Sequence, residues 1–242
     1  MAGLDPRRRQ YLDAMGIEVW VSRVAGAAAV QDSPPQNRQD PPTAEPQSVA
    51  IPPGTAPGLN WDALRQRVLN CTACDLHRTR TQAVFGVGDI RSNILVVGEA
   101  PGAEEDRQGE PFVGRAGQLL NAMLVAFGRP RETVYIANVL KCRPPNNRDP
   151  LPTESVCCRP YLERQIELLS PRLILAVGRV PAQNLLNTDE AVGRLRGKVH
   201  RYGPNGIPLV VTYHPSYLLR QPQEKKKSWQ DLVLARSVLK SV

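Results

Sequence analysis

Four short apolar runs in the second half of the chain predict buried β-strands. Each run contains branched apolar residues and closes on a polar or small residue, and near-continuous apolar runs of this length are typical of strands covered on both faces. The four runs are Ile94–Gly98, Val134–Asn138, Leu173–Gly178 and Leu209–Tyr213.

Stretches with helical periodicity lie before, between and after these runs, at Trp61–Leu69, Ala116–Phe127, Thr153–Leu169, Pro181–Leu186 and Ser228–Leu239. Asn60 and Thr153 are candidate N-caps for the first and third of them. Alternating strands and helices predict an α/β fold with a parallel sheet and helices on both of its faces. Ligands of such sheets bind beyond the carboxyl ends of the strands, so the candidate chemistry is sought there.

The first part of the chain has a different composition from the rest. Residues 1–20 contain a short amphipathic stretch that we interpret as a docking segment for a protein partner. Residues 21–58 are rich in proline and polar residues, which predicts an extended linker without a core. Residues 59–242 then form the expected folded domain, and a monomer is the default expectation.

Composition and charge narrow the class of protein. The 242 residues carry a formal net charge of +8, which favours a polyanionic partner, most often nucleic acid. The charged N-terminus predicts no secretory signal, and no apolar run is long enough for a membrane span. We therefore expect a cytoplasmic protein, in which the five cysteines do not form a disulfide framework.

Four of the cysteines have a spacing that suggests a shared metal centre. Cys71 and Cys74 form a C-x2-C pair, and fifteen residues separate Cys142 from Cys158. Structural zinc and an iron–sulfur cluster are both possible. The wide second pair favours a cluster, but spacing alone leaves both open, as well as the alternative that some of these are ordinary buried thiols. Cys157, beside Cys158, is more typical of the latter.

Two segments after the first strand are candidates for ligand binding. Gly98 permits close backbone approach to a ligand, and the acidic residues that follow it repel phosphate, so the segment suits a neutral ligand or a developing positive charge. The alternative is a solvated acidic loop. Phe112, between a proline and a glycine-containing turn, is a candidate stacking surface, although a core position is the commoner role.

The second strand ends at Asn138, whose amide can donate and accept hydrogen bonds and therefore suits the edge of a pyrimidine. An Asx turn is the structural alternative. Lys141, Arg143 and Arg148 follow it and are candidate phosphate contacts.

The fourth strand leads to His214, which Pro215 fixes at the strand end. It is a candidate hydrogen-bond donor to a developing anion, although a lone histidine is more often structural. Leu218, within the apolar stretch Tyr217–Leu219, is a candidate wedge for a DNA stack, and Arg220 a candidate backbone contact.

Several motifs in one order make the chain resemble the family 4 uracil-DNA glycosylases, which carry an iron–sulfur cluster. The matching motifs are Gly98–Asp106, Glu110–Gly117, Ala137–Pro145, Cys158–Pro160 and Thr212–Ser216, and the resemblance runs from about Leu59 to the C-terminus. It implies a three-layer α/β/α sandwich around a four-stranded parallel sheet. It also implies a [4Fe–4S] cluster, mainly structural, on Cys71, Cys74, Cys142 and Cys158, the last because Arg159-Pro160 follows it.

The resemblance further implies a monofunctional DNA-repair enzyme that acts on uracil-containing DNA. Deoxyuridine would be flipped out and its glycosidic bond hydrolysed, leaving an abasic site. Phe112 would stack on the base, Asn138 would read its edge, and His214 would stabilise the departing anion. The implied uracil pocket consists of Gly98, Glu99, Ala100, Pro101, Phe112, Asn138 and His214.

One feature departs from some relatives, which place a water-positioning Asp where this chain has Ala100. The remaining candidates for that role are Glu99, Glu105 and the backbone. A neighbouring subgroup of relatives captures the sugar covalently through a histidine in an inserted basic stretch. No such insertion follows Gly117 in this chain, so we expect catalytic turnover. Two rival interpretations are a glycosylase of broader base range, similar to family 5, and a non-catalytic nucleic-acid-binding module with structural zinc.

Overall fold

The computed structural model describes residues 58–241. The expected docking segment (1–20) and the expected linker (21–58), apart from its last residue, lie outside the described residues. Within the described range, no helix combines the length and apolar character that crossing a membrane requires.

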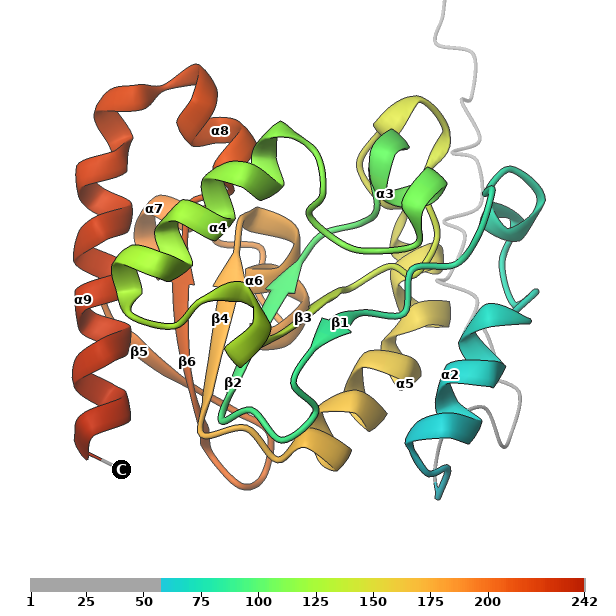
Figure 1. Cartoon of the computed structure of the whole chain (residues 1–242), viewed down its shortest axis with the longest axis horizontal. Coiled ribbons are helices and arrows are strands. Elements are labelled where there is room, and N and C mark those ends of the chain that lie inside the picture. The colour runs from blue at the N-terminus through green and yellow to red at the C-terminus, as the bar shows by residue number, and fades with distance from the viewer. Residues whose placement is uncertain (1–57, 242) are drawn as a thin grey trace, which may run out of the picture. The chain divides into compact units, whose positions relative to one another are not determined.

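The sheet has six strands in the order β1-β3-β2-β4-β6-β5 (Figure 1). The four central strands are parallel to one another and correspond to the four apolar runs: β2 (Ile94–Gly98), β3 (Tyr135–Asn138), β4 (Leu173–Val177) and β6 (Ile207–Thr212). The α/β class is therefore confirmed.

The sequence predicted a sheet of four parallel strands, and the structure adds one antiparallel strand at each edge of it. These are β1 (Val87–Gly88) and β5 (Val199–Tyr202). β1 has only two residues, and β5 alternates exposed with half-buried side chains, among them His200 and Arg201. Neither strand therefore forms an apolar run that a sequence pattern could show.

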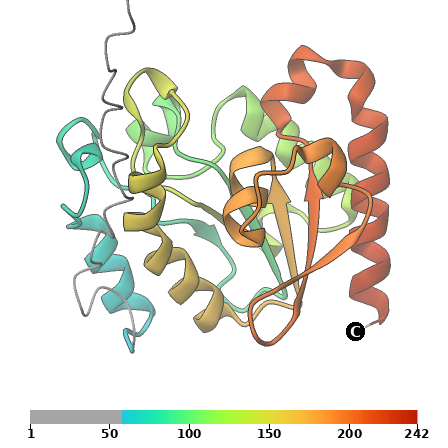
Figure 2. The same ribbon diagram turned by 180° about the vertical axis from the view of Figure 1, so that it is seen from behind.

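Alternating side chains of the central strands pack into two separate cores. Ile94 and Val96 belong to one cluster, while Leu95 and Val97 belong to the other. The first core is covered by α4 (Arg115–Phe127), α8 (Pro215–Arg220) and α9 (Lys225–Ser241), as Figure 1 shows. The second is covered by α5 (Pro152–Leu169), α6 (Arg179–Leu186) and α7 (Val192–Leu195), seen from behind in Figure 2.

The remaining elements are shorter or lie at one side of the sheet. α2 (Trp61–Leu69) packs beside α5, and α3 (Ala103–Gln108) follows β2. Single 3-10 turns occupy Asp75–Arg78, Arg131–Thr133, Pro145–Asn147 and Pro222–Glu224. A third apolar cluster, which includes Leu64, Val68 and Cys158, joins α2 to α5.

One of the two expected helix caps is confirmed and the other is wrong. The Asn60 side chain accepts a hydrogen bond from the Ala63 N–H at 2.9 Å at the start of α2. α5 begins before Thr153, at Pro152, with Leu151 as N-cap. Glu154 accepts the Leu151 N–H at 2.8 Å, and proline suits the first helical turn.

Candidate active site

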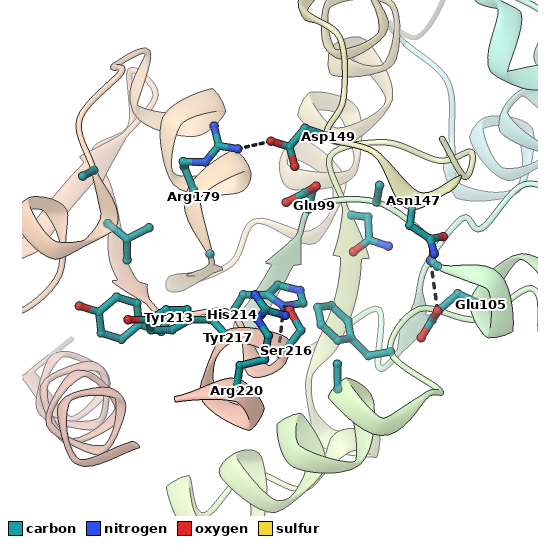
Figure 3. A pocket seen from close by; sticks show the side chains of 18 of the residues that line it. Glu99, Glu105, Asn147, Asp149, Arg179, Tyr213, His214, Ser216, Tyr217 and Arg220 are labelled. Atoms are coloured by element: carbon teal, nitrogen blue, oxygen red, sulfur yellow. Dashed lines mark hydrogen bonds and ion pairs between the residues drawn. The ribbon is translucent and has the colours of Figure 1, made fainter. Parts of the chain in front are cut away.

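An open cleft of about 740 Å³ lies beyond the carboxyl ends of the parallel strands, where the topology predicts a ligand site (Figure 3). Five residues of the expected uracil pocket line it, and Gly98 and Pro101 do not. The five are Glu99, Ala100, Phe112, Asn138 and His214.

Gly98 contributes to the cleft by having no side chain. A Cβ at this position would collide with the Asn138 amide oxygen and with the ring of Phe112. The close approach predicted at Gly98 is therefore made by two side chains of the protein, which pack over its Cα at the end of β2.

Phe112 lies in the loop before α4, in a left-handed backbone conformation with φ of 54°. Its carbonyl oxygen accepts a hydrogen bond from Arg131 Nη1 at 3.1 Å, and a Cβ at Gly117 would collide with that same oxygen. The ring is 6% exposed and its centroid lies 5.7 Å from that of His214, with the two planes tilted by 31°. This geometry makes the ring a wall of the cleft.

The Glu105 carboxylate fixes the loop that carries Phe112. Its Oε1 accepts the N–H groups of Val113 at 2.9 Å and Gly114 at 3.1 Å. Its Oε2 accepts the Gly102 N–H at 3.1 Å, at the start of α3. Glu105 also lines the cleft, but three backbone donors occupy its oxygens.

Asn138 lies in the wall of the cleft and carries a buried acceptor without a partner. Its side chain is 2% exposed, and its Oδ1 has no hydrogen-bond partner among the described residues. An unpaired buried acceptor costs about 1–3 kcal/mol, so the atom is suited to a donor on a ligand. Hydrogen bonds from Val139 N–H to Gly98 O and from Leu140 N–H to Glu99 O hold the backbone just beyond β3.

His214 is oriented by the start of α8. Its Nδ1 accepts the Ser216 N–H at 3.1 Å and lies 2.7 Å from Ser216 Oγ. A neutral ring that accepts at Nδ1 carries its hydrogen on Nε2. The pKa of His214 is lowered to about 4, mainly by burial and also by the charge of Arg220, while Glu105 acts in the opposite direction. At neutral pH the ring is thus an uncharged N–H donor.

A second acidic residue, Glu99, also lines the cleft (Figure 3). The pKa of Glu99 is raised, mainly by burial and to a smaller extent by the nearby Asp149, while Arg179 acts in the opposite direction. Arg179 Nη2 and Asp149 Oδ2 form an ion pair of 2.5 Å.

Several residues that line the cleft were not predicted from the sequence, including Arg179, Asp149 and Ser216. Arg179 directly follows Gly178 at the end of the β4 run, so the strand-end rule that selected Asn138 and His214 would also have selected it.

Two candidate DNA contacts are wrong because their side chains are buried. Lys141 is 1% exposed, and its Nζ donates to Asn138 O at 2.8 Å and to Gln165 Oε1 at 2.6 Å. It cannot reach a phosphate. Leu218 is also 1% exposed and belongs to the core under α4, whereas its neighbour Leu219 is 38% exposed.

The other three candidates have at least part of their surface accessible. Arg220 is exposed at the cleft. Arg148 pairs with both oxygens of Glu154, at 2.9 and 2.6 Å. Arg143 Nε donates to Asn147 Oδ1 at 2.7 Å. In the free protein, two of these arginines are therefore bound to neighbouring residues, Arg143 to Asn147 and Arg148 to Glu154 at the start of α5.

The five cysteines line one small cavity beside β3 and α5: Cys71, Cys74, Cys142, Cys157 and Cys158. The Tyr161 hydroxyl donates to Cys71 Sγ at 3.1 Å, and Arg80 Nη1 donates to Cys142 Sγ at 2.9 Å. Among residues 58–241, no three potential ligand groups are close enough to hold a single metal ion.

The chemistry of this cavity fits a thiolate-ligated cluster. Its donor set is all sulfur, and N–H and O–H donors point at the sulfurs, as expected around electron-rich thiolates. Burial raises the pKa of Cys158 to about 12 and that of Cys74 to about 11. Without a bound metal these groups are therefore neutral thiols.

The sequence also matches known proteins. Residues 85–234 match the family model of the Uracil DNA glycosylase superfamily. A protein from Archaeoglobus fulgidus named type-4 uracil-DNA glycosylase is 45% identical over 70% of this chain and 88% of its own length. The chain belongs to the type-4 uracil-DNA glycosylases. Proteins of the same name from Pyrobaculum aerophilum and Thermotoga maritima are 43% and 42% identical, over 73% and 74% of this chain and 93% and 94% of their own lengths. In this type-4 uracil-DNA glycosylase, the cleft is the candidate active site and the cysteine cavity the candidate cofactor site.

Proposed function

We propose that this uracil-DNA glycosylase hydrolyses the bond between uracil and deoxyribose in DNA through the cleft at the strand ends, leaving an abasic site. Family membership supports the reaction. The observation that carries the assignment of the site is the buried, unpaired Oδ1 of Asn138, which lies in one cleft with Phe112 and His214.

Uracil reaches this cleft only after its nucleotide leaves the base stack. The Phe112 ring supplies a flat apolar wall for the extruded base. Asn138 Oδ1 accepts the N3–H of uracil, and its amide nitrogen donates to the adjacent carbonyl oxygen. Cytosine has an acceptor at N3 and an amino group beside it, so this pairing is reversed and the base is rejected.

His214 acts on the leaving group. As the C1′–N1 bond breaks, its electron pair moves onto uracil, whose O2 becomes negative. The Nε2–H of the neutral ring donates to that oxygen and stabilises the developing charge. Water then adds to C1′, which has oxocarbenium character, and the proton that it releases balances the charge of the uracil anion. No covalent enzyme intermediate is required.

We assign different roles to the two acidic residues. Glu105 positions Phe112, because three backbone N–H groups occupy its carboxylate. Glu99 lines the cleft at the end of β2 and is the better candidate to orient the water and to face the positive sugar. Ala100 contributes only space.

The DNA backbone is held by positive charge around the cleft. Arg220 lies at the cleft itself, and Arg143 and Arg148 lie on the loop after β3. Leu219 replaces Leu218 as the candidate wedge, because its side chain is exposed on α8, the helix that also carries Arg220. The net charge of +8 favours this polyanionic partner.

Cys71, Cys74, Cys142 and Cys158 are the candidate ligands of a [4Fe–4S] cluster. When bound, the cluster supplies structural order to the segments that flank the cleft. Metal analysis of the purified protein tests this assignment. We expect iron and acid-labile sulfide in equal amounts with a brown colour; zinc alone would contradict it.

The glycosylase assignment is tested with a labelled oligonucleotide that contains one uracil, incubated without added metal or nucleotide. Alkali then cleaves any abasic site, and a strand with thymine in place of uracil is the control. We expect cleavage of the uracil strand only, and its loss in the Asn138→Ala protein. An iron-loaded preparation that cleaves neither single- nor double-stranded substrate would contradict the proposal.

A further inference from the structure

Lys141 connects the cleft to the cysteine cavity. Its ammonium is buried and donates to the backbone carbonyl of Asn138 at 2.8 Å. The same side chain lines the cavity of the five cysteines. One charged group therefore contacts the residue that presents the unpaired acceptor and also faces the candidate cluster ligands.

The second hydrogen-bond acceptor of Lys141 is Gln165, which is itself held in place. Gln165 Nε2 donates to Phe85 O at 2.9 Å, which orients Gln165 Oε1 toward the Lys141 ammonium at 2.6 Å. Both oxygens that Lys141 contacts are uncharged. A buried cation with only neutral acceptors is costly unless opposite charge lies nearby. Lys141 directly precedes Cys142 and lines one cavity with Cys142 and Cys158, so thiolate ligands of a bound cluster would place negative charge beside the ammonium.

We propose that Lys141 is a positioning residue that couples the cysteine cavity to the uracil pocket. Its ammonium balances the thiolates of a bound cluster on one side and fixes the Asn138 backbone on the other. This inference rests on the proposed function, and it adds a specific physical link between the cofactor site and base recognition. Loss of the cluster leaves the cation unbalanced, and the orientation of Asn138 is lost with it.

Arg80 provides a matched comparison. It also carries a positive charge to this cavity and donates to Cys142 Sγ, but its second nitrogen donates to Leu69 O at 2.9 Å. Like Lys141 it does not line the cleft, but neither of these two hydrogen bonds reaches Asn138, whereas Lys141 donates to the Asn138 carbonyl. If any positive charge near the cluster has the same effect, replacing either residue should change the protein in the same way. If Lys141 couples the cavity to uracil recognition, only its replacement should weaken that recognition.

The experiment compares iron-loaded wild type with the Lys141→Met and Arg80→Gln proteins. Affinity is measured for an oligonucleotide with 2′-fluoro-2′-deoxyuridine, whose fluorine slows bond cleavage, and for the same strand with thymidine. The reduction potential of the cluster is the second readout. We expect Lys141→Met to lose about 10–100-fold of the preference for the uracil strand, the range typical of groups that orient metal ligands. Both variants should shift the potential to more negative values, since each removes a cation that favours the added electron.

Arg80→Gln should keep the wild-type preference for uracil. Equal losses of preference in both variants, or none in Lys141→Met, would overturn the coupling. If Lys141→Met does not fold, the shorter, neutral Lys141→Gln is measured in its place with the same expectations. Uracil cleavage by the wild type is recorded in parallel, so that a failure of the coupling is distinguished from a failure of the proposed function.

Discussion

At the scale of single residues, the candidate chemistry depends on two atoms that the protein leaves available. Asn138 Oδ1 is buried and unpaired, and the Nε2–H of His214 is available because its Nδ1 is occupied by Ser216. Both residues could be selected from the sequence because each lies at the end of an apolar run. Lys141 could not be placed, because the acceptor that draws its side chain inward, Gln165, lies 24 residues away on α5.

Exchanging the Asn138 amide for a carboxylate tests base recognition directly. In Asn138→Asp the donor to uracil is replaced by an acceptor, so we expect uracil excision to fall by about 100-fold or more. Cytosine excision should become detectable, because the new acceptor suits its amino group. Cleavage of strands with a single uracil or cytosine measures both, and Asn138→Ala, which should lose the first activity without gaining the second, is the control.

Because the pKa of His214 is low, we expect the reaction rate to change little as the pH falls from neutral to about 5. With a pKa of about 4, the ring stays neutral from pH 8 down to about pH 5. Protonation of Nδ1 below that range breaks its bond from the Ser216 N–H, and activity falls. Single-turnover rates between pH 4 and 8 measure this. A decline centred near pH 6.5, the ordinary value for histidine, would show that the ring is not held neutral.

At the scale of elements, apolar runs were sufficient to predict the four central strands and the longest helices. The short helices α3, α7 and α8 each have six residues or fewer, too few for a periodic pattern to emerge. The loop that carries Phe112 was also out of reach, because its shape depends on Glu105 in the preceding helix and on Arg131 after the following one.

The different roles of the two acidic residues predict different kinetic defects. Glu105→Gln replaces one acceptor oxygen with an amide that faces backbone donors, so the Phe112 loop loosens. We expect KM to rise by about tenfold, with a smaller change in kcat. Glu99→Gln should lower kcat by about 10–100-fold and leave KM near the wild-type value. Steady-state kinetics on one uracil strand separate the two, and the same defect in both variants would contradict the division of roles.

At the scale of the whole molecule, the cysteine cavity joins segments that are far apart in sequence. Cys71 and Cys74 follow α2, Cys142 follows β3, and Cys158 lies on α5. The sequence spacing predicted this gathering, but it could not show how Cys157 and Cys158 differ. In the structure Cys158 is 3% exposed, while Cys157 is only partly buried.

Adjacent cysteines give a matched pair of variants for the cofactor site. Cys158→Ser should yield a colourless protein whose melting temperature is lower by on the order of 10 °C, since binding of a structural metal centre also stabilises the fold. Cys157→Ser should keep its iron and its stability. Iron analysis and thermal unfolding measure both. Iron loss from Cys157→Ser with retention in Cys158→Ser would reverse the ligand assignment.

The two facing rings of the cleft have a consequence for how the protein matures during synthesis. Phe112 and His214 come from distant parts of the chain, the first between α3 and α4 and the second between β6 and α8. All four candidate cluster ligands are present once α5 has left the ribosome. The cleft can form only after β6 and α8 have also been synthesised. A nascent chain therefore acquires its cofactor ligands before it can hold a base, and a product truncated after α5 would carry every candidate ligand while lacking His214.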